Sequence, residues 1–244
     1  MAEPAVPTLA FEERPAAGSP DGLLVLHHGR GSDEHDLLGL ADVLDPERRL
    51  HVVTPGAPLR VPGWPGKHWY VVPQVGYPDP DTFRTSYLAL SAFHDELWSR
   101  TGVAPARTIL GGFSMGSVMS HALGLAPTRP ARPTGDPSAD ESARDGALPG
   151  RPVVAGILGL SGFVPTVEDW APELEPRAGK TRVLNAHGRQ DPVIAYGFAE
   201  QARALVSGGG LDLTALDFDG GHQIAPQHVP AIAAWVGETL PRSG

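Results

Sequence analysis

Hydrophobic residues recur along the chain in two alternating patterns. Short, unbroken apolar runs are typical of strands that are buried on both faces, whereas apolar positions that return every three or four residues predict amphipathic helices. The predicted strands are 23–28, 50–54, 108–110, 153–160, 182–187 and 211–218. The predicted helices are 33–44, 82–100, 118–125, 195–206 and 227–240. Strands that alternate with helices indicate an α/β fold with a mostly parallel, doubly wound sheet and helices on both faces.

Two segments interrupt this alternation. Residues 57–81 are rich in Pro, Gly, Trp and Tyr, and a loop of that length in a compact domain is typical of a functional segment. Residues 127–152 hold one large apolar residue, Leu148, among Pro, Asp, Arg, Ser and Ala, so they cannot bury enough surface to offset the entropy of ordering. Because the alternation resumes afterwards, we predict a single domain over 1–244 with a mobile insertion at 127–152.

Composition narrows the class of protein. With 244 residues, 41% hydrophobic and 19% charged, the chain can build one sizeable core. No apolar run reaches the ~18 residues of a membrane span, and residues 1–20 lack the pattern of a signal peptide. The absence of cysteine excludes disulfides and thiolate nucleophiles and fits a cytoplasmic protein. The net charge of −9 argues against nucleic-acid binding, and we expect a monomer or a homodimer.

A serine between glycines follows one predicted strand. The segment Gly112-Phe113-Ser114-Met115-Gly116 has the pattern G-x-S-x-G, with strand 108–110 before it and helix 118–125 after it. In a strand–turn–helix of this kind the serine is strained and its hydroxyl points into a cleft. The glycines are needed because a Cβ there would collide with the neighbouring strand and helix. The pattern predicts Ser114 as a nucleophile.

Two later strand ends offer the partners that such a serine needs. A serine hydroxyl is a poor nucleophile until a base, normally a histidine oriented by a carboxylate, accepts its proton. Asp191 follows strand 182–187 and His222 follows strand 211–218, at the edge of the sheet where ligands bind. The order Ser114, Asp191, His222 is that of α/β-hydrolases.

Other residues compete less well for these roles. Asp217 lies within a predicted strand, Asp219 is too near His222 in sequence, and His228 falls in the last helix. A metal site is not expected, because the neighbouring histidines 27 and 28 face opposite ways on a strand.

The same reasoning predicts an oxyanion hole. One donor is the backbone N–H of Met115, at the start of the helix after the nucleophile. The second comes from the loop His28-Gly29-Arg30-Gly31, which has the expected H-G-x-G pattern, and we assign it to the N–H of Arg30.

Four segments carry a resemblance to a known family: LHHGRGSDEHDLLGLA, GGFSMGS, NAHGRQDPVI and GGHQI. Together they resemble the phospholipase/carboxylesterase family, which includes acyl-protein thioesterases and bacterial carboxylesterases. The resemblance implies an α/β-hydrolase fold without a large lid domain, and hydrolysis of carboxylic esters or thioesters without a cofactor or metal. It assigns Ser114 as nucleophile, Asp191 as orienting acid and His222 as base, with Arg30 and Met115 in the oxyanion hole. Because acyl-protein thioesterases commonly have Gln where this chain has Met115, a bacterial carboxylesterase is favoured.

We therefore expect a serine carboxylesterase that acts on a small-molecule ester with a small to medium acyl group, through an acyl-enzyme. An acyl-thioesterase or lysophospholipase would use the same triad, and a non-catalytic binding protein with a hydrolase fold is the alternative of another class. Loop aromatics either line the substrate pocket or only pack the loops. They are Trp64, Trp69, Tyr70, Phe163 and Trp170.

Overall fold

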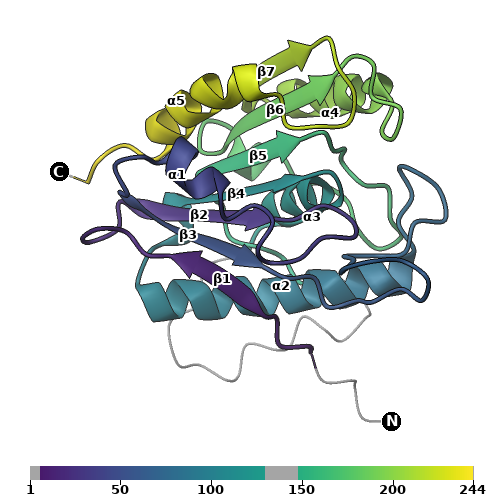
Figure 1. Ribbon diagram of the computed structural model, residues 1–244, viewed down its shortest axis with the longest axis horizontal. Helices are drawn as coiled ribbons and strands as arrows, with labels where there is room; N and C mark the ends of the chain where they lie inside the picture. The colour runs from purple at the N-terminus through teal and green to yellow at the C-terminus, as the bar shows by residue number, and fades with distance from the viewer. Residues whose placement is uncertain (1–5, 130–147, 244) are drawn as a thin grey trace.

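The computed structural model describes residues 6–129 and 148–243 (Figure 1). Its centre is a seven-stranded sheet in the order β1-β3-β2-β4-β5-β6-β7. Only β1 runs antiparallel to its neighbour, and all other pairs are parallel. The strands are β1 Phe11–Arg14, β2 Gly22–His27, β3 Leu50–Pro55, β4 Thr108–Phe113, β5 Gly156–Leu160, β6 Arg182–Gly188 and β7 Asp212–Phe218. The predicted fold class, a mostly parallel sheet between helices, is confirmed.

Helices cover both faces of this sheet (Figure 1). The α-helices are α1 Leu40–Leu44, α2 Pro80–Thr101, α3 Met115–Gly124, α4 Tyr196–Gly208 and α5 Val229–Thr239. Short 3₁₀ turns are η1 Pro105–Arg107, η3 Glu175–Arg177 and η4 Pro226–His228. Buried side chains of α2, α3 and α4 pack in one core layer, and those of α1 and α5 pack in the other. No helix in the described ranges is long and apolar enough to cross a membrane.

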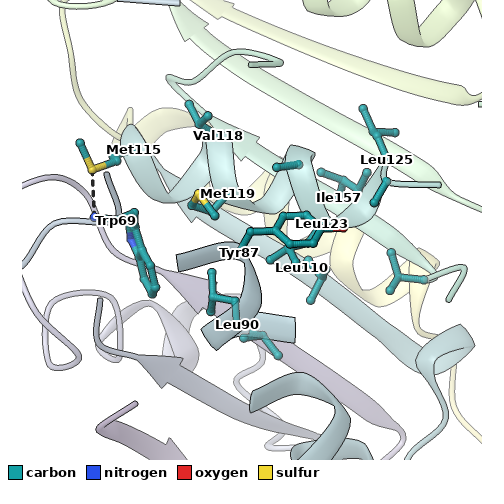
Figure 2. Packing of buried hydrophobic residues seen from close by; sticks show 14 of the residues in the cluster. Trp69, Tyr87, Leu90, Leu110, Met115, Val118, Met119, Leu123, Leu125 and Ile157 are labelled. Carbon is teal, nitrogen blue, oxygen red and sulfur yellow. Dashed lines mark hydrogen bonds between the residues drawn. The ribbon is translucent and has the colours of Figure 1, made fainter. Parts of the chain in front are cut away.

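The two core layers follow from the alternation of side chains along the strands. In β2, Leu23 and Val25 face the layer of α2 and α3, whereas Leu24 and Leu26 face the layer of α1 and α5. All four are completely buried, which explains why the strand is an unbroken apolar run. Figure 2 shows the first layer, where Tyr87 and Leu90 of α2 lie against Met119 and Leu123 of α3. Burying one such side chain contributes about 2 kcal/mol.

The predicted helix 82–100 is confirmed and extended at both ends. Asp79 is its N-cap and accepts a hydrogen bond from the Thr82 N–H at 3.0 Å, with Pro80 in the first turn. Gly102 ends the helix in the left-handed conformation, with φ of 67°. The helix runs beneath the β1 edge of the sheet (Figure 1).

The predicted helix 33–44 is wrong in its first half. Residues 34–39 form turns, in which the Leu40 N–H donates to the Leu37 oxygen three residues back, and only Leu40–Leu44 is an α-helix. The preceding residue, Ser32, forms an antiparallel bridge with Lys67. This contact joins the start of the segment to the long loop.

Strand β1 was not predicted. Its sequence FEER is short and mostly polar, and it lies at the sheet edge, where one side of the strand stays in contact with solvent. It pairs with β3, for example with Glu12 opposite Thr54. No local pattern in the sequence predicts this long-range contact.

The two ends of the stretch 127–152 are ordered. The Arg151 N–H donates to the Pro127 oxygen at 2.7 Å, and the Arg151 side chain is buried. The two ends of the stretch therefore pair with one another, and its mobility stays a prediction. The middle, 130–147, lies outside the described residues.

Candidate active site

The serine turn has the strained geometry that its pattern predicts. Ser114 lies between β4 and α3 with φ of 55° and ψ of −119°, a conformation that destabilises a non-glycine residue by about 1–3 kcal/mol. A Cβ on Gly116 would lie 2.0 Å from the His27 carbonyl oxygen, and one on Gly112 would lie 2.5 Å from the Gly116 carbonyl carbon. The flanking glycines are thus required by close backbone contacts with β2 and with each other.

Ser114, His222 and Asp191 form a hydrogen-bonded chain across three strand ends. The Ser114 Oγ is 2.8 Å from the His222 Nε2, and the His222 Nδ1 is 2.7 Å from the Asp191 Oδ2. The three residues follow β4, β7 and β6, which are parallel and end at the same edge of the sheet. Because a carboxylate only accepts, Nδ1–H donates to Asp191 and Nε2 is left to accept the serine proton. The ring of Phe113 packs on that of His222, with centroids 4.9 Å apart.

The Asp191 carboxylate is buried but stays ionised. Burial raises its pKa, but the pKa is lowered overall by the Ile194 N–H, by His222 and by the Val193 N–H. Both backbone bonds are 2.8 Å long and end on Oδ1, which leaves Oδ2 for the histidine. The His187 Nε2–H donates to the Ile194 oxygen at 2.8 Å and so helps to hold the loop that carries Asp191.

The competing residues lie in other environments. Asp217 is held by Arg203, Arg189 and the Tyr196 hydroxyl, and the His228 ring packs edge-on against Phe218. They therefore belong to contacts outside the serine–histidine–aspartate chain.

The loop after β2 lies against the serine turn. A Cβ on Gly29 would lie 3.6 Å from the Ser114 Cβ. The His28 Nε2 accepts the Ala57 N–H at 3.0 Å, so its Nδ1–H donates to the Gly29 oxygen at 2.7 Å. In a trans peptide the Arg30 N–H points opposite to that oxygen, which directs it away from the His28 ring.

The two predicted oxyanion donors are both free. Within residues 6–129 and 148–243, neither the Arg30 N–H nor the Met115 N–H has a hydrogen-bond acceptor. The Met115 N–H is the first of its helix and so has no acceptor within the helix. Two unsatisfied donors beside a serine hydroxyl are what a developing oxyanion needs.

Two of the five loop aromatics, Trp69 and Trp170, pack the loops, which is one of the two roles expected for them. Trp69 and Trp170 are buried, and their indole N–H groups donate to the carbonyl oxygens of His28 at 2.9 Å and Ala122 at 3.1 Å. Buried indoles with backbone acceptors pack and fix loops. Trp69 thereby holds the strand end that leads to the oxyanion loop.

The other three aromatics line cavities. Trp64, which is 54% exposed, and Tyr70 line a cavity of about 90 Å³ together with Arg30. Phe163 lines an apolar cavity of about 220 Å³ and packs on Phe198, with ring centroids 5.3 Å apart. Sequence reasoning missed Phe198 and the stacking role of Phe113, although Phe113 is one of the two variable positions of the G-x-S-x-G pattern.

No group of three or more metal-binding side chains lies together among the described residues.

Comparison with known proteins agrees with this fold. The family model described as phospholipase/carboxylesterase matches residues 14–134. An acyl-protein thioesterase 1 from Gibberella zeae is 26% identical over 93% of this chain and 94% of its own. The crystal structure of esterase PE8 has a TM-score of 0.72 at 27% identity and covers 95% of this chain and 99% of that one. A carboxylesterase from Bacillus cereus has the same fold, with a TM-score of 0.75 at 20% identity over 95% and 94% of the two chains. Residues 14–134 thus match the phospholipase/carboxylesterase family, and the chain has the fold of α/β-hydrolase carboxylesterases.

Proposed function

We propose that this hydrolase is a serine carboxylesterase that acts through an acyl-enzyme. The observation that carries the proposal is the continuous hydrogen-bonded chain from the Ser114 hydroxyl through the His222 ring to the Asp191 carboxylate. A base that already accepts a hydrogen bond from the hydroxyl, and is oriented by an ionised carboxylate, is the arrangement that activates serine.

In the first half-reaction the Ser114 Oγ attacks the acyl carbon while His222 accepts its proton. The negative charge that forms on the carbonyl oxygen is bound by the N–H groups of Arg30 and Met115. Asp191 stabilises the imidazolium. His222 then gives the proton to the leaving alcohol, and the bond between the acyl carbon and that alcohol breaks.

In the second half-reaction water takes the place of the alcohol. His222 removes one proton from water as its oxygen attacks the ester of Ser114, and then returns that proton to the Ser114 Oγ. The carboxylic acid leaves and the free serine is restored. Atoms and charges balance over the cycle, which consumes one ester and one water.

We propose that the ester substrate carries a small to medium acyl group. The apolar cavity beside Phe163 and Phe198, about 220 Å³, is a candidate for the acyl chain because it lies along the segment that follows β5. A long lipid chain would need more apolar surface.

The test is Ser114→Ala assayed on p-nitrophenyl acetate and butyrate. We expect kcat/KM to fall by about 10³-fold or more, because intact triads contribute several orders of magnitude. Ser117→Ala is the matched control, since Ser117 lies one turn further along α3 with a buried hydroxyl that has no partner among the described residues. A loss of only a few-fold in Ser114→Ala would overturn the assignment of the nucleophile.

Thioester hydrolysis on the same atoms is the second candidate, favoured by the similarity to the acyl-protein thioesterase 1 of Gibberella zeae over nearly the full chain. Matched oxygen and sulfur esters of butyrate separate the two, and a lysophospholipid tests a lysophospholipase in the same way. A non-catalytic binding protein would not react with a fluorophosphonate, so labelling at Ser114 would exclude it.

A further inference from the structure

The Arg30 side chain places an uncompensated positive charge beside the oxyanion loop. Its guanidinium lies 4.6 Å from the centroid of the exposed Trp64 ring. Throughout the described part of the chain no carboxylate forms an ion pair with it, whereas the neighbouring cation, Lys67, is paired with Glu34. A cation–π contact orients a guanidinium but leaves its charge available to an anion.

The backbone beside Arg30 is joined to the loop that carries Trp64. The Gly31 N–H donates to the Lys67 oxygen at 2.9 Å, and the Lys67 N–H donates to the Ser32 oxygen at 2.8 Å. A Cβ on Gly66 would lie 2.1 Å from the Gly31 oxygen, so the two backbones touch. The turn that carries Arg30 and the turn that carries Trp64 are therefore one rigid unit.

A small cavity lies between these side chains. It measures about 90 Å³ and is lined by Arg30, Trp64, His68, Tyr70 and valine side chains. A cavity of this size has room for a small anionic group such as a carboxylate or a phosphate. Burial lowers the pKa of His68, and its Nε2–H donates to the Pro65 oxygen, so Arg30 is the charge of this cavity at neutral pH.

Arg30 connects this cavity to the proposed reacting centre, since its side chain lines the cavity and its backbone N–H is a proposed oxyanion donor. An anionic group a few bonds from the scissile carbonyl would meet the guanidinium. We propose that the natural ester carries such an anion and that the Arg30 side chain selects it, an inference that rests on the proposed serine esterase activity. The net charge of −9 repels anions, so the selection is local to this side chain.

The test compares pairs of esters that differ only in charge. For the acyl side, the anionic ester is the mono-4-nitrophenyl ester of glutaric acid, and the neutral ester is the same compound with its free carboxyl group methylated. For the alcohol side, the anionic ester is 4-carboxyphenyl acetate, and the neutral ester is its methyl ester. Rates are corrected for spontaneous hydrolysis and measured for the wild type, Arg30→Gln, Arg30→Lys and Arg60→Gln. Arg60 is exposed and lies in the same long loop outside the cavity, so it matches the change in charge.

We expect the ratio of kcat/KM for the anionic ester to that for the neutral ester to fall about 10-fold in Arg30→Gln, through KM, because a charge-assisted hydrogen bond is lost. Arg30→Lys should restore part of the ratio, and Arg60→Gln should leave it unchanged. The pair that responds identifies the side of the ester that carries the anion.

An unchanged ratio for both pairs in Arg30→Gln overturns the inference, and so does an equal fall in Arg60→Gln, which would show general electrostatic attraction. Hydrolysis that persists in Ser114→Ala would instead refute the proposed function itself, so the two failures are distinguishable.

Discussion

The backbone N–H of Trp69 donates to the Sδ of Met115 at 3.2 Å (Figure 2). This bond joins the long loop 57–81 to the residue that follows the candidate nucleophile, 46 positions further along the chain. The same tryptophan donates from its indole to the His28 oxygen. One residue therefore fixes the loop against both the serine turn and the oxyanion loop.

Met115→Ala should loosen this junction. The substitution leaves the buried Trp69 N–H without an acceptor, which destabilises the folded protein by about 1–3 kcal/mol. It also opens a cavity, which lowers the free energy of unfolding by a further amount of about 2 kcal/mol or more. We expect the free energy of unfolding in urea to fall by about 3 kcal/mol or more, and kcat/KM to fall with it. Met115→Leu keeps the volume without the acceptor and should lose less, and Met115→Gln restores an acceptor oxygen. Equal stability of the Ala and Leu variants would contradict this account.

His28 should act on the reaction through the Gly29 carbonyl. His28→Ala frees the peptide that presents the Arg30 N–H, so we expect kcat to fall about 10²-fold, as when an oxyanion donor is removed, with KM nearly unchanged. His28→Asn places an amide N–H close to the position of Nδ1 and should recover part of kcat. A purely structural role would instead give equal losses in both variants, parallel to their losses of stability.

Local patterns in the sequence predict the candidate site better than they predict the loops around it. Ser114, Asp191 and His222 each stand just beyond an apolar run, and parallel strands necessarily end at one edge, so their meeting could be predicted. The failed helix 33–44 is different, because its apolar positions have the period of a helix although residues 34–39 form turns, next to a bridge between Ser32 and the long loop.

The aromatics of the loops show the same limit. Trp64 and Trp69 lie in one loop with similar neighbours in sequence, yet one is exposed and the other completely buried. Which of them turns inward depends on the Met115 sulfur and the His28 carbonyl, two acceptors from distant segments. Composition could predict that loop aromatics matter, but not which of them line a cavity.

Gly116→Ala should prevent the serine turn from forming. The added Cβ would lie 2.0 Å from the His27 carbonyl oxygen and 2.5 Å from the His28 carbonyl oxygen, so α3 would have to move away from β2. We expect loss of activity together with a fall of the melting temperature by several degrees, because overpacking destabilises by about 1–3 kcal/mol. Gly197→Ala is the control, since a Cβ there meets nothing within 4 Å and alanine favours the α4 helix. An active and stable Gly116→Ala variant would refute the close contact.

Three histidines buried in the core should make folding stability depend on pH. Burial lowers the pKa of His27 to about 3 and that of His121 to about 4, and it lowers the pKa of His94 well below its ordinary value. In the unfolded chain each histidine titrates near pH ~6.5, so the unfolded state binds protons that the folded state does not. The stability that these groups contribute is present above pH ~6.5 and is lost as the pH falls toward their folded pKa values.

Between pH 7.5 and 5.5 the three histidines together should lower the free energy of unfolding by about 4 kcal/mol. At pH 5.5, about one unit below its unfolded pKa, each histidine is protonated in the unfolded chain but not in the folded one, which favours the unfolded state by about 1.4 kcal/mol. Urea unfolding at the two pH values measures this fall. The His121 Nδ1–H donates to the Ser117 oxygen at 2.8 Å, and an asparagine amide can replace that donor, so His121→Asn should reduce the fall by about 1.4 kcal/mol. His35→Asn, at an exposed histidine, should leave it unchanged. Equal pH dependence in the wild type and His121→Asn would show that His121 takes up its proton in the folded state, against the effect of its burial.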